Sequence, residues 1–466
     1  MADKDELIHE VKIYVDKFRS WKRRVLEKKI SYYKHLVRQT IRGISFKTRG
    51  DKIEEFGEIL HSNSEIYFTT DLVKTGFTDQ LIGFSFLYKL GLGLGLKYHH
   101  TRLSSHRSSV PFLFYPYSKE KLPGKDQSDI FDFLGLNSFL KRNFGRNLPD
   151  GTKEVKINME ATLFRSNSVK NYETLIDEMK VILHPFLKND RTILITFECS
   201  PITYFKYYKY VASKREHELD FRQLFRDMES ENQFKSTFKE NTKKVMVHIR
   251  QGDTGVLKTP WNTFIPTWYE TKGKYTQFQK RQDISHRLLI DVDEFYRFLK
   301  DLLKQFDASE ISAAVFSDGF KKTFRAIYQS YKVEDISHKE ISKLKEIEST
   351  YDEQEFQEFR MLPGVESVIG EEVEKLYKFI HSFMEAEILI CGTQGIMIPK
   401  FLATYGDQTK MPLMIMLYKT ERPYLNHVGF DNSEDFMIFV DIENYDIDMV
   451  SKQVKNYFNQ RDLISK

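Results

Sequence analysis

Short apolar runs alternate with longer helical segments in two separate series along this chain. The first series has strand-like runs at residues 65–69, 95–98, 153–157 and 192–197, with a helical segment at 172–183. The second has apolar runs at 245–249, 313–316, 387–391 and 413–417, with helical segments at 293–305, 320–331, 371–384 and 396–404. Alternating strands and helices are typical of parallel sheets whose faces are covered by helices. The sequence therefore predicts an α/β protein with two doubly wound, Rossmann-like domains.

The same pattern indicates where the domains begin and end. We expect an N-terminal helical extension at residues 1–60, a first domain at 61–240 and a second domain at 241–430. A tail at 431–466 is expected to pack back onto the first domain. The 466 residues suffice for two or three domains of ordinary size, so this division is compatible with the length of the chain.

The helical extension has one apolar stripe, and its other faces are heavily basic. Apolar residues recur with helical spacing at Val11, Tyr14, Phe18, Trp21 and Val25. Such a stripe favours packing against the rest of the protein or a second subunit, because aromatic residues at helical spacing usually mark packing. The basic faces leave a second interpretation open, namely a helix that binds a membrane surface or an anionic polymer.

The balance of charge restricts the partners of the protein. The formal net charge is +4, so the chain is only mildly basic. Such a charge tolerates anionic ligands but does not by itself indicate nucleic acid, and no nucleic-acid-binding module is recognisable. We find neither a signal-peptide core at the N-terminus nor an apolar stretch long enough to cross a membrane. We therefore expect a cytoplasmic protein that is peripheral to a membrane at most.

Cysteines and acidic pairs give no sign of a metal site. Cys199 and Cys391 stand at the ends of strand-like runs, and their spacing provides neither a disulfide framework nor a metal-binding pattern. Both are expected to be small buried residues. Asp291 and Asp293 are spaced like a metal-binding pair, but they precede a helical segment that Asp293 is suited to cap. The glycine-rich segment 91–95 follows a helix and precedes a strand, the reverse of a dinucleotide-binding loop.

The apolar run 245–249 leads into the first candidate for a ligand site. It ends with His248, Ile249 and Arg250, and Asp253 follows three residues later. In open α/β sheets, ligands bind at the carboxyl ends of the strands, where these side chains are expected. A guanidinium can hold two phosphate oxygens at once and stays charged at physiological pH, so Arg250 suits a phosphate or diphosphate.

Three further segments place small or polar residues beside the end of a strand. They are Gly76 to Gln80, Ser317 with Asp318, and Thr393 with Gln394. Backbone N–H groups in such loops, and at the start of a following helix, can bind phosphate oxygens. The carboxylate of Asp318 could accept hydrogen bonds from the N1 and amino groups of guanine.

These segments also have purely structural interpretations, which the sequence leaves open. Arg250 is close enough in sequence to Asp253 for an ion pair, and Asp318 is suited to cap the helix that follows it. The glycines around Thr393 and Gln394 would also suit an ordinary turn between a strand and a helix.

Taken in order, the four segments resemble the fucosyltransferase superfamily, which includes α1,2-, α1,6- and protein O-fucosyltransferases and a nodulation fucosyltransferase. Its members combine a glycine-containing loop before a helix, an H-x-R-x-x-D sequence at a strand end, a strand followed by Ser-Asp, and a late small-polar loop. Here these are Gly76–Gln80, His248–Asp253, Ser317-Asp318 and Gly392–Gly395. The resemblance implies the GT-B architecture, in which two domains face a cleft. It also implies inverting transfer of fucose from GDP-fucose, without a metal or another cofactor.

The resemblance also implies roles for individual residues. Arg250 matches the arginine that stabilises the leaving diphosphate, and His248 matches the residue that supports this arginine or contacts the nucleotide. Asp253 matches the acid that holds the base or orders its loop. The remaining nucleotide-binding positions are matched by Gly76, Gln80, Ser317, Asp318, Thr393 and Gln394. The acceptor would be a glycan, a polysaccharide or another hydroxyl compound.

The sequence departs from the family pattern at three places. Asp79 stands where the family has asparagine, and it is also suited to cap the following helix. Gln251 replaces the second arginine of the α1,6 branch, and the loop at 254–258 lacks that branch's carboxylate. These departures favour an alternative, a catalytically inactive fucosyltransferase-like protein that binds a glycan or another protein. In an active enzyme, the general base would lie in the first domain, or the diphosphate itself would take the proton.

Overall fold

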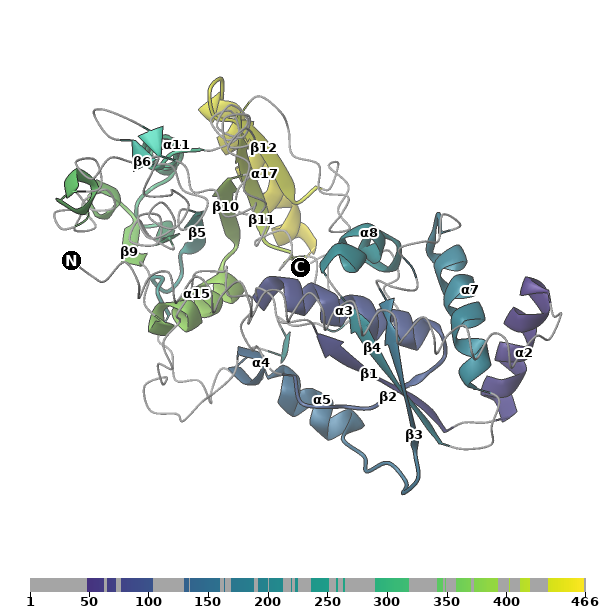
Figure 1. Cartoon of the computed structure of the whole chain (residues 1–466). Helices are drawn as coiled ribbons and strands as arrows, with labels where there is room; N and C mark the ends of the chain where they lie inside the picture. Colours follow the sequence, from purple (N-terminus) through teal and green to yellow (C-terminus); the bar gives the residue numbers. More distant parts are fainter. Residues whose placement is uncertain are drawn as a thin grey trace, which may run out of the picture. The chain divides into compact units, whose positions relative to one another are not determined.

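Figure 1 shows the structure, a computed structural model of the whole chain. It describes residues 48–62, 65–72, 77–103, 130–133, 135–159, 163, 169–187, 192–199, 201–212, 219, 223–224, 236–250, 257–258, 263–264, 290–317, 342–346, 348, 358–369, 373–392, 402, 411–419 and 435–464. Residues 1–47 of the expected helical extension, the expected helix at 320–331 and almost all of that at 396–404 lie outside the described residues.

Two parallel sheets form the framework of the described chain, which confirms the predicted α/β class (Figure 1). The first is a four-stranded sheet in the order β2-β1-β4-β3. Its strands are β1 (Ile66–Leu72), β2 (Lys97–Tyr98), β3 (Lys153–Asn158) and β4 (Ile193–Cys199). Helices α3 (Phe77–Gly93) and α8 (Pro201–Ala212) follow β1 and β4 and pack against each other, and α4 (Ile130–Phe133) and α5 (Leu136–Phe144) precede β3.

The second sheet has six strands and a more informative topology. Its strands are β5 (Lys243–Ile249), β8 (Ile311–Ser317), β9 (Val365–Ile369), β10 (Ile388–Gly392), β11 (Leu413–Tyr418) and β12 (Met437–Asp441). Counted along the chain, they lie in the order 3-2-1-4-5-6 from β9 to β12. This is the strand order of doubly wound dinucleotide-binding sheets, in which the ligand lies where the direction of the connections reverses. Here the reversal falls between β5 and β10.

Alternate residues of β5 face opposite sides of the second sheet. Val245, Val247 and Ile249 belong to a hydrophobic core that also contains buried residues of the helices α11 (Val292–Leu303) and α17 (Ile447–Ile464). Because side chains alternate along a strand, Met246 and His248 point to the other side. That side is covered by α15 (Val373–Glu385), whose Phe379 contacts the ring of His248.

Helix α11 forms because a strong N-terminal cap precedes one apolar face. Asp291 accepts a hydrogen bond from the N–H of Glu294, and the Glu294 carboxylate accepts one from the N–H of Asp291. This reciprocal arrangement is a capping box. The buried residues that follow recur with helical spacing at Val292, Phe295, Phe298, Leu299, Leu302 and Leu303. We expected Asp293 to cap this helix; the cap is Asp291, because only Asp291 precedes the first turn and faces its N–H groups.

The C-terminal tail completes the second sheet. Strand β12 pairs in parallel with β11, and α17 contributes Val450, Val454 and Phe458 to the core of this sheet. Residues 437–458 thus extend the second sheet and cover one of its faces, because the apolar run of β12 supplies a sixth strand with buried side chains. The expected return of the tail to the first domain remains a prediction.

The glycine-rich segment 91–95 ends helix α3. Gly91 lies so close to Phe68 of β1 that a methyl group at this position would overlap the phenyl ring. Gly95 has a φ of 79°, the left-handed conformation that glycine adopts most readily after the last turn of a helix. These glycines therefore serve close packing and helix termination.

By its internal packing, the chain divides into two compact units. One comprises Met1–Ile66 and Ser168–Ile193, and the other comprises Tyr67–Asn167 and Leu194–Lys466. The domain boundaries that we inferred from the sequence, at residues 60, 240 and 430, remain predictions.

Helices α2 (Arg49–Ser62) and α7 (Tyr172–Leu183) pack together within the smaller unit. Helix α7 has the predicted bounds and is capped by Asn171. Two ion pairs join the helices and the turn after α7. The Nη2 of Arg49 lies 3.1 Å from Oε2 of Glu178. The Nε2 of the buried His184 lies 2.6 Å from Oε2 of Glu55.

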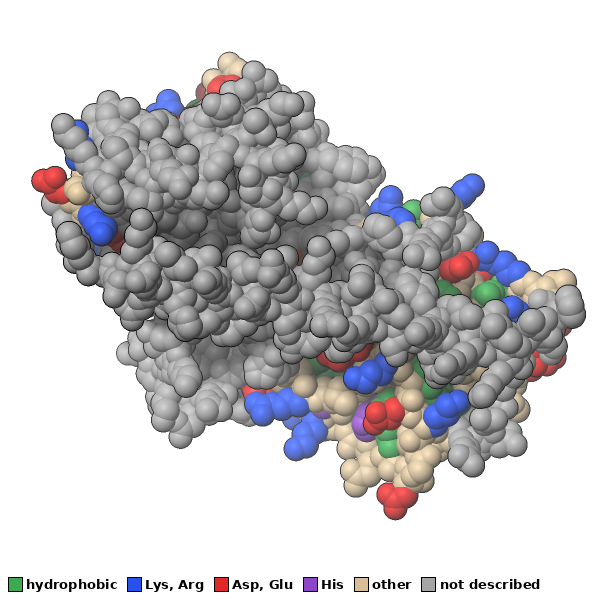
Figure 2. Space-filling model, viewed as in Figure 1, with side chains coloured by type: hydrophobic (Ala, Val, Ile, Leu, Met, Phe, Trp, Pro, Cys, Tyr) green, Lys and Arg blue, Asp and Glu red, His purple; other side chains and the backbone are tan. Residues whose placement is uncertain are grey.

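Two predictions concern cysteines and membrane spans. Cys199 and Cys391 are both buried, which confirms their prediction as small interior residues. Among the helices of the described ranges, none is both long and apolar enough to cross a bilayer. Where described side chains are visible in Figure 2, basic ones lie among acidic ones.

A partly buried polar network joins the amino end of β5 to α15. The Nζ of Lys244 lies 2.8 Å from Oε1 of Glu385, and the hydroxyl of Ser236 donates to Oε2 at 2.8 Å. The Nδ1 of His381 lies 3.3 Å from the same Oε2. Burial alone would raise the pKa of Glu385, but the nearby His381 ring, the hydrogen bonds from Lys244 and Ser236 and the charge of Lys244 lower it to about 2. The ionised form is therefore strongly favoured in the folded state.

Replacing Glu385 with glutamine should lower the free energy of unfolding at neutral pH. It should also weaken the dependence of this free energy on pH in the acid range. A carboxyl group whose pKa is depressed on folding stabilises the protein above its unfolded pKa and loses this contribution as the pH falls through the folded value. For Glu385 this contribution to the free energy of unfolding is on the order of 3 kcal/mol, and it is lost as the pH falls from 4.5 to about 2. Urea unfolding at several pH values would measure it. Glu366→Gln, at an exposed ion pair with Lys239, is the matched control and should change the free energy of unfolding little. If wild type and Glu385→Gln lose stability equally as the pH falls, the prediction is contradicted.

Candidate functional site

The carboxyl edge of the second sheet brings the ends of β5 and β10 side by side. Cys391 of β10 is level with His248 of β5, and on the other side of β5 Ile249 is level with Ser317 of β8. From β5 the chain connects toward β8, whereas from β10 it connects toward β11. In α/β sheets, a ligand binds where neighbouring strands diverge in this way. This edge is therefore the candidate site.

Arg250 is the first residue after β5 and is partly buried. Its positive charge is one cause of the lowered pKa of His248, so the guanidinium lies within electrostatic range of that imidazole. The structure thus places a permanent positive charge at the carboxyl end of the strand where the connections reverse.

His248 is a buried, neutral imidazole. It is 4% exposed and packs edge-on against Phe379, with ring centroids 5.4 Å apart. Burial, and then the charge of Arg250, lower the pKa of His248 to about 3. Its Nδ1 has no hydrogen-bond partner among the described residues. At physiological pH His248 therefore adds no charge beside Arg250, and its predicted contact with a nucleotide remains a prediction.

Of the other residues that we predicted at the edge of the second sheet, Ser317 is the one that the structure describes. Ser317 ends β8 and is buried, but it is level with Ile249, whose side chain lies in the core beneath α11. Because side chains on aligned strands alternate together, Ser317 and His248 lie on opposite faces of the sheet. Asp253, Asp318, Thr393, Gln394 and Gly76 lie outside the described residues, so their roles remain predictions.

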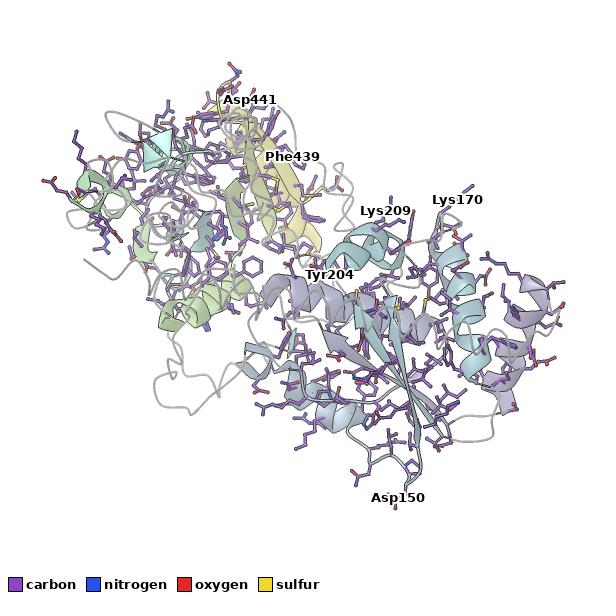
Figure 3. All side chains as sticks on the ribbon, viewed as in Figure 1. Asp150, Lys170, Tyr204, Lys209, Phe439 and Asp441 are labelled. Carbon is purple, nitrogen blue, oxygen red and sulfur yellow. The ribbon has the colours of Figure 1, made fainter. Side chains whose placement is uncertain are left out.

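The predicted loop of the first sheet leads into α3. Gln80 is buried in the first turn of this helix. Asp79 was expected to cap the helix, but α3 begins at Phe77, so Asp79 lies inside the first turn, where its charge suits the helix dipole. Burial, and then the neighbouring charge of Asp79 and a hydrogen bond to it, raise the pKa of Tyr204 on α8 (Figure 3). The phenol therefore stays protonated beside the carboxylate of Asp79.

One pair of charged residues at the second sheet's carboxyl edge was not predicted. Lys419 directly follows β11, and its Nζ lies 2.6 Å from Oε1 of Glu294 in the first turn of α11. Both side chains are mostly enclosed, with 13% and 12% of their surface exposed. The sequence signal was present, because Lys419 ends the apolar run 413–417 just as Arg250 ends the run 245–249.

No family model, curated protein or solved structure matches this chain.

Within the described ranges, no group of three or more His, Cys, Asp and Glu side chains is arranged to hold a metal ion. At the described edge lie a guanidinium, a neutral imidazole and an enclosed lysine–glutamate pair. Two cations near a strand reversal suit an anionic ligand.

Proposed function

We propose that this protein is an inverting glycosyltransferase that takes its sugar from a nucleotide-sugar donor and transfers it to a hydroxyl group of a glycan or a similar acceptor. One observation carries the proposal. The second sheet has the 3-2-1-4-5-6 order, and the strand at its reversal ends in Arg250. This strand order is that of sheets that bind nucleotides through their phosphates. The resemblance of four strand-end segments to the fucosyltransferase superfamily supports GDP-fucose as the donor.

In the proposed reaction, Arg250 acts on the leaving group. Negative charge grows on the diphosphate as its bond to the sugar breaks, so a fixed cation stabilises the transition state more than the ground state. The planar guanidinium can hold two phosphate oxygens at once. His248 is neutral because it is buried, so it can orient Arg250 or accept a hydrogen bond without competing for the anion. In this mechanism the cationic role falls to the protein rather than to a metal.

The two parallel sheets support the finer GT-B architecture, which is part of the proposal. In a GT-B enzyme, one doubly wound domain binds the donor and the other contributes to acceptor binding across a cleft. The six-stranded sheet with Arg250 would belong to the donor domain. The four-stranded sheet, with α3 and α8 at the ends of adjacent strands, would belong to the acceptor domain.

Asp79 favours a second candidate function, a fucosyltransferase-like protein that binds ligands without catalysis. Its carboxylate is engaged by Tyr204 at the start of α3. A carboxylate there would repel a phosphate, whereas the family's asparagine would not. Such a protein would bind a glycan or a partner but would not turn over the donor.

A nucleotide panel tests the proposed function. Differential scanning fluorimetry would compare GDP, GDP-fucose, GDP-mannose, UDP, dTDP and guanosine at equal concentrations. We expect GDP and GDP-fucose to raise the Tm by several degrees and guanosine to have little effect, because ligand at about 100 times its Kd stabilises a protein by about 2.7 kcal/mol. Release of GDP from GDP-fucose would then separate an enzyme from a silent binder. A Tm that no GDP compound moves would rule out the guanine-nucleotide proposal.

A further inference from the structure

The ion pair between Lys419 and Glu294 lies at the edge where the donor is proposed to bind. Leu417 belongs to the core under α11, so Lys419, two residues later, points to the same face of the sheet. Glu294 belongs to α11, which precedes β8, whereas Lys419 follows β11. Strand β10 lies between β11 and β5 in the sheet. The contact between Lys419 and Glu294 therefore lies at the carboxyl edge on the α11 face, beside the reversal of strand order.

The distances at this edge allow Lys419 and Arg250 to act on one ligand. Strands β11 and β5 are the two neighbours of β10, so their ends are about 10 Å apart, which is two strand spacings. Arg250 follows β5 and Lys419 follows β11. Because side chains alternate, Arg250 leaves β5 toward the face of His248, whereas Lys419 leaves β11 toward the α11 face. The two cations therefore flank the end of β10 from opposite faces, and a diphosphate that lies across the strand ends would meet one on each side. A diphosphate carries more than one negative charge, so one guanidinium alone does not offset it.

Glu294 is held in place independently of Lys419. Its Oε2 accepts a hydrogen bond from the N–H of Asp291 at 2.9 Å, whereas its Oε1 faces Lys419. The carboxylate also lies in the first turn of α11, where the helix dipole favours a negative charge. If Lys419 left this pair, Glu294 would keep both interactions. The pair can therefore open without leaving an isolated buried charge.

An enclosed ion pair of this kind is poor evidence for a stabilising role. Taking two charges out of water costs free energy that their attraction often fails to recover, and apolar residues of similar size usually serve as well. A positive charge retained at the carboxyl edge of a nucleotide-binding topology is, however, suited to an anionic ligand.

We infer that Lys419 is a second phosphate-binding residue of the donor site, and that Glu294 holds it in an ion pair which the nucleoside diphosphate replaces. The inference rests on the proposed function and adds a residue to its donor site. In the empty protein, Lys419 pairs with Glu294. In the complex, its ammonium group turns to the diphosphate while Glu294 stays on the capping box of α11. Glu294 thus competes with the ligand for the same cation.

This competition predicts opposite effects for the two halves of the pair. Lys419→Gln should raise the Kd for GDP by roughly 10- to 100-fold, because a charge-assisted hydrogen bond is lost. Glu294→Gln should lower the Kd for GDP by a few fold, because Lys419 is released while the amide oxygen still serves the capping box. Neither substitution should change the Kd for guanosine. A purely structural pair would leave both Kd values for GDP unchanged.

Isothermal titration calorimetry with GDP, guanosine and inorganic pyrophosphate tests this inference on the full chain. A Kd for GDP that Lys419→Gln leaves unchanged, or that Glu294→Gln leaves unchanged or raises, would overturn it. Should Lys419→Gln not fold, Glu294→Gln alone decides. If the wild type binds GDP and Arg250→Ala abolishes that binding while neither pair variant affects it, only the inference about Lys419 fails. If the wild type binds no nucleoside diphosphate at all, the proposed function fails as well.

Discussion

Replacing Arg250 with alanine should reduce sugar transfer from GDP-fucose by roughly 10³-fold or more while leaving the fold intact. The partly buried guanidinium stands at the end of β5, where the strand connections of the second sheet reverse. If the leaving diphosphate is bound there, its growing charge loses its main partner in the variant. Because the side chain leaves a strand end rather than the hydrophobic core, we expect the Tm to change by only a few degrees.

His248 cannot take over the missing charge in this variant. Burial is the larger cause of its lowered pKa, and the charge of Arg250 is the smaller one. Removing Arg250 therefore raises the pKa of His248 only in part, and the imidazole stays neutral near pH 7. The loss in the variant should for this reason be nearly independent of pH between 6 and 8.

Two further variants sharpen this experiment. Arg250→Lys keeps a positive charge but loses the planar fork, so its activity should fall between those of wild type and Arg250→Ala. Arg297→Ala, at an exposed position of α11, is the matched control and should have nearly full activity. Transfer rates would be measured with radiolabelled donor, and the Kd for GDP in parallel, so that a binder without turnover is also tested. Near-normal transfer and GDP binding by Arg250→Ala would remove Arg250 from the proposed mechanism.

Replacing Gly91 with alanine should destabilise the protein by about 2 kcal/mol, although alanine is the better helix former. Gly91 lies in α3, directly against the ring of Phe68, and a methyl group there would overlap that ring. Phe68 is fully buried, and its ring centroid lies 6.5, 5.2 and 5.9 Å from those of Tyr88, Tyr98 and Phe197. The ring has no space into which it can move, so overpacking outweighs the gain in helix propensity.

Gly57 provides the matched control, for which we expect a change in stability of the opposite sign. It also lies inside a helix, α2, but a methyl group at this position would meet nothing within 4 Å. Gly57→Ala should therefore stabilise the protein by about 0.5–1 kcal/mol, the ordinary effect of replacing glycine in a helix. Urea midpoints of both variants would be compared with the wild type. If both substitutions shift the midpoint in the same direction, the close packing of α3 on β1 does not control stability as we argue.

The interior strands were predictable because a parallel strand buried on both faces is a nearly continuous apolar run. Strands β5, β8, β10 and β11 were all found in this way. Strand β9 was missed, because Val365–Ile369 includes an exposed glutamate and a serine. Among the described strands it lies at the edge beside β8 and pairs with β8 alone, and an edge strand tolerates charge. Its apolar content was too low to stand out from the preceding charged segment.

The candidate site was predictable only in part, for two different reasons. The rule that polar residues at strand ends face the ligand edge pointed to Arg250, and the same rule would have pointed to Lys419. The partner of Lys419, Glu294, belongs to a distant helix, and a contact between remote segments leaves no local pattern in one sequence. The burial of His248 likewise depends on Phe379 of α15, which only the folded structure brings against it.

The strand order of the second sheet also has a consequence for synthesis on the ribosome. Residues 245–248 of β5 align with residues 388–391 of β10, so about 140 further residues must be translated before the two strands can pair. At about 5–20 residues per second this takes roughly 7–28 s. Strand β8 is made sooner and can pair with β5 in that interval, whereas the other edge of β5 stays unpaired until β10 has been made. A nascent chain that stops before β10 would therefore carry Arg250 without the neighbouring strand that completes the reversal.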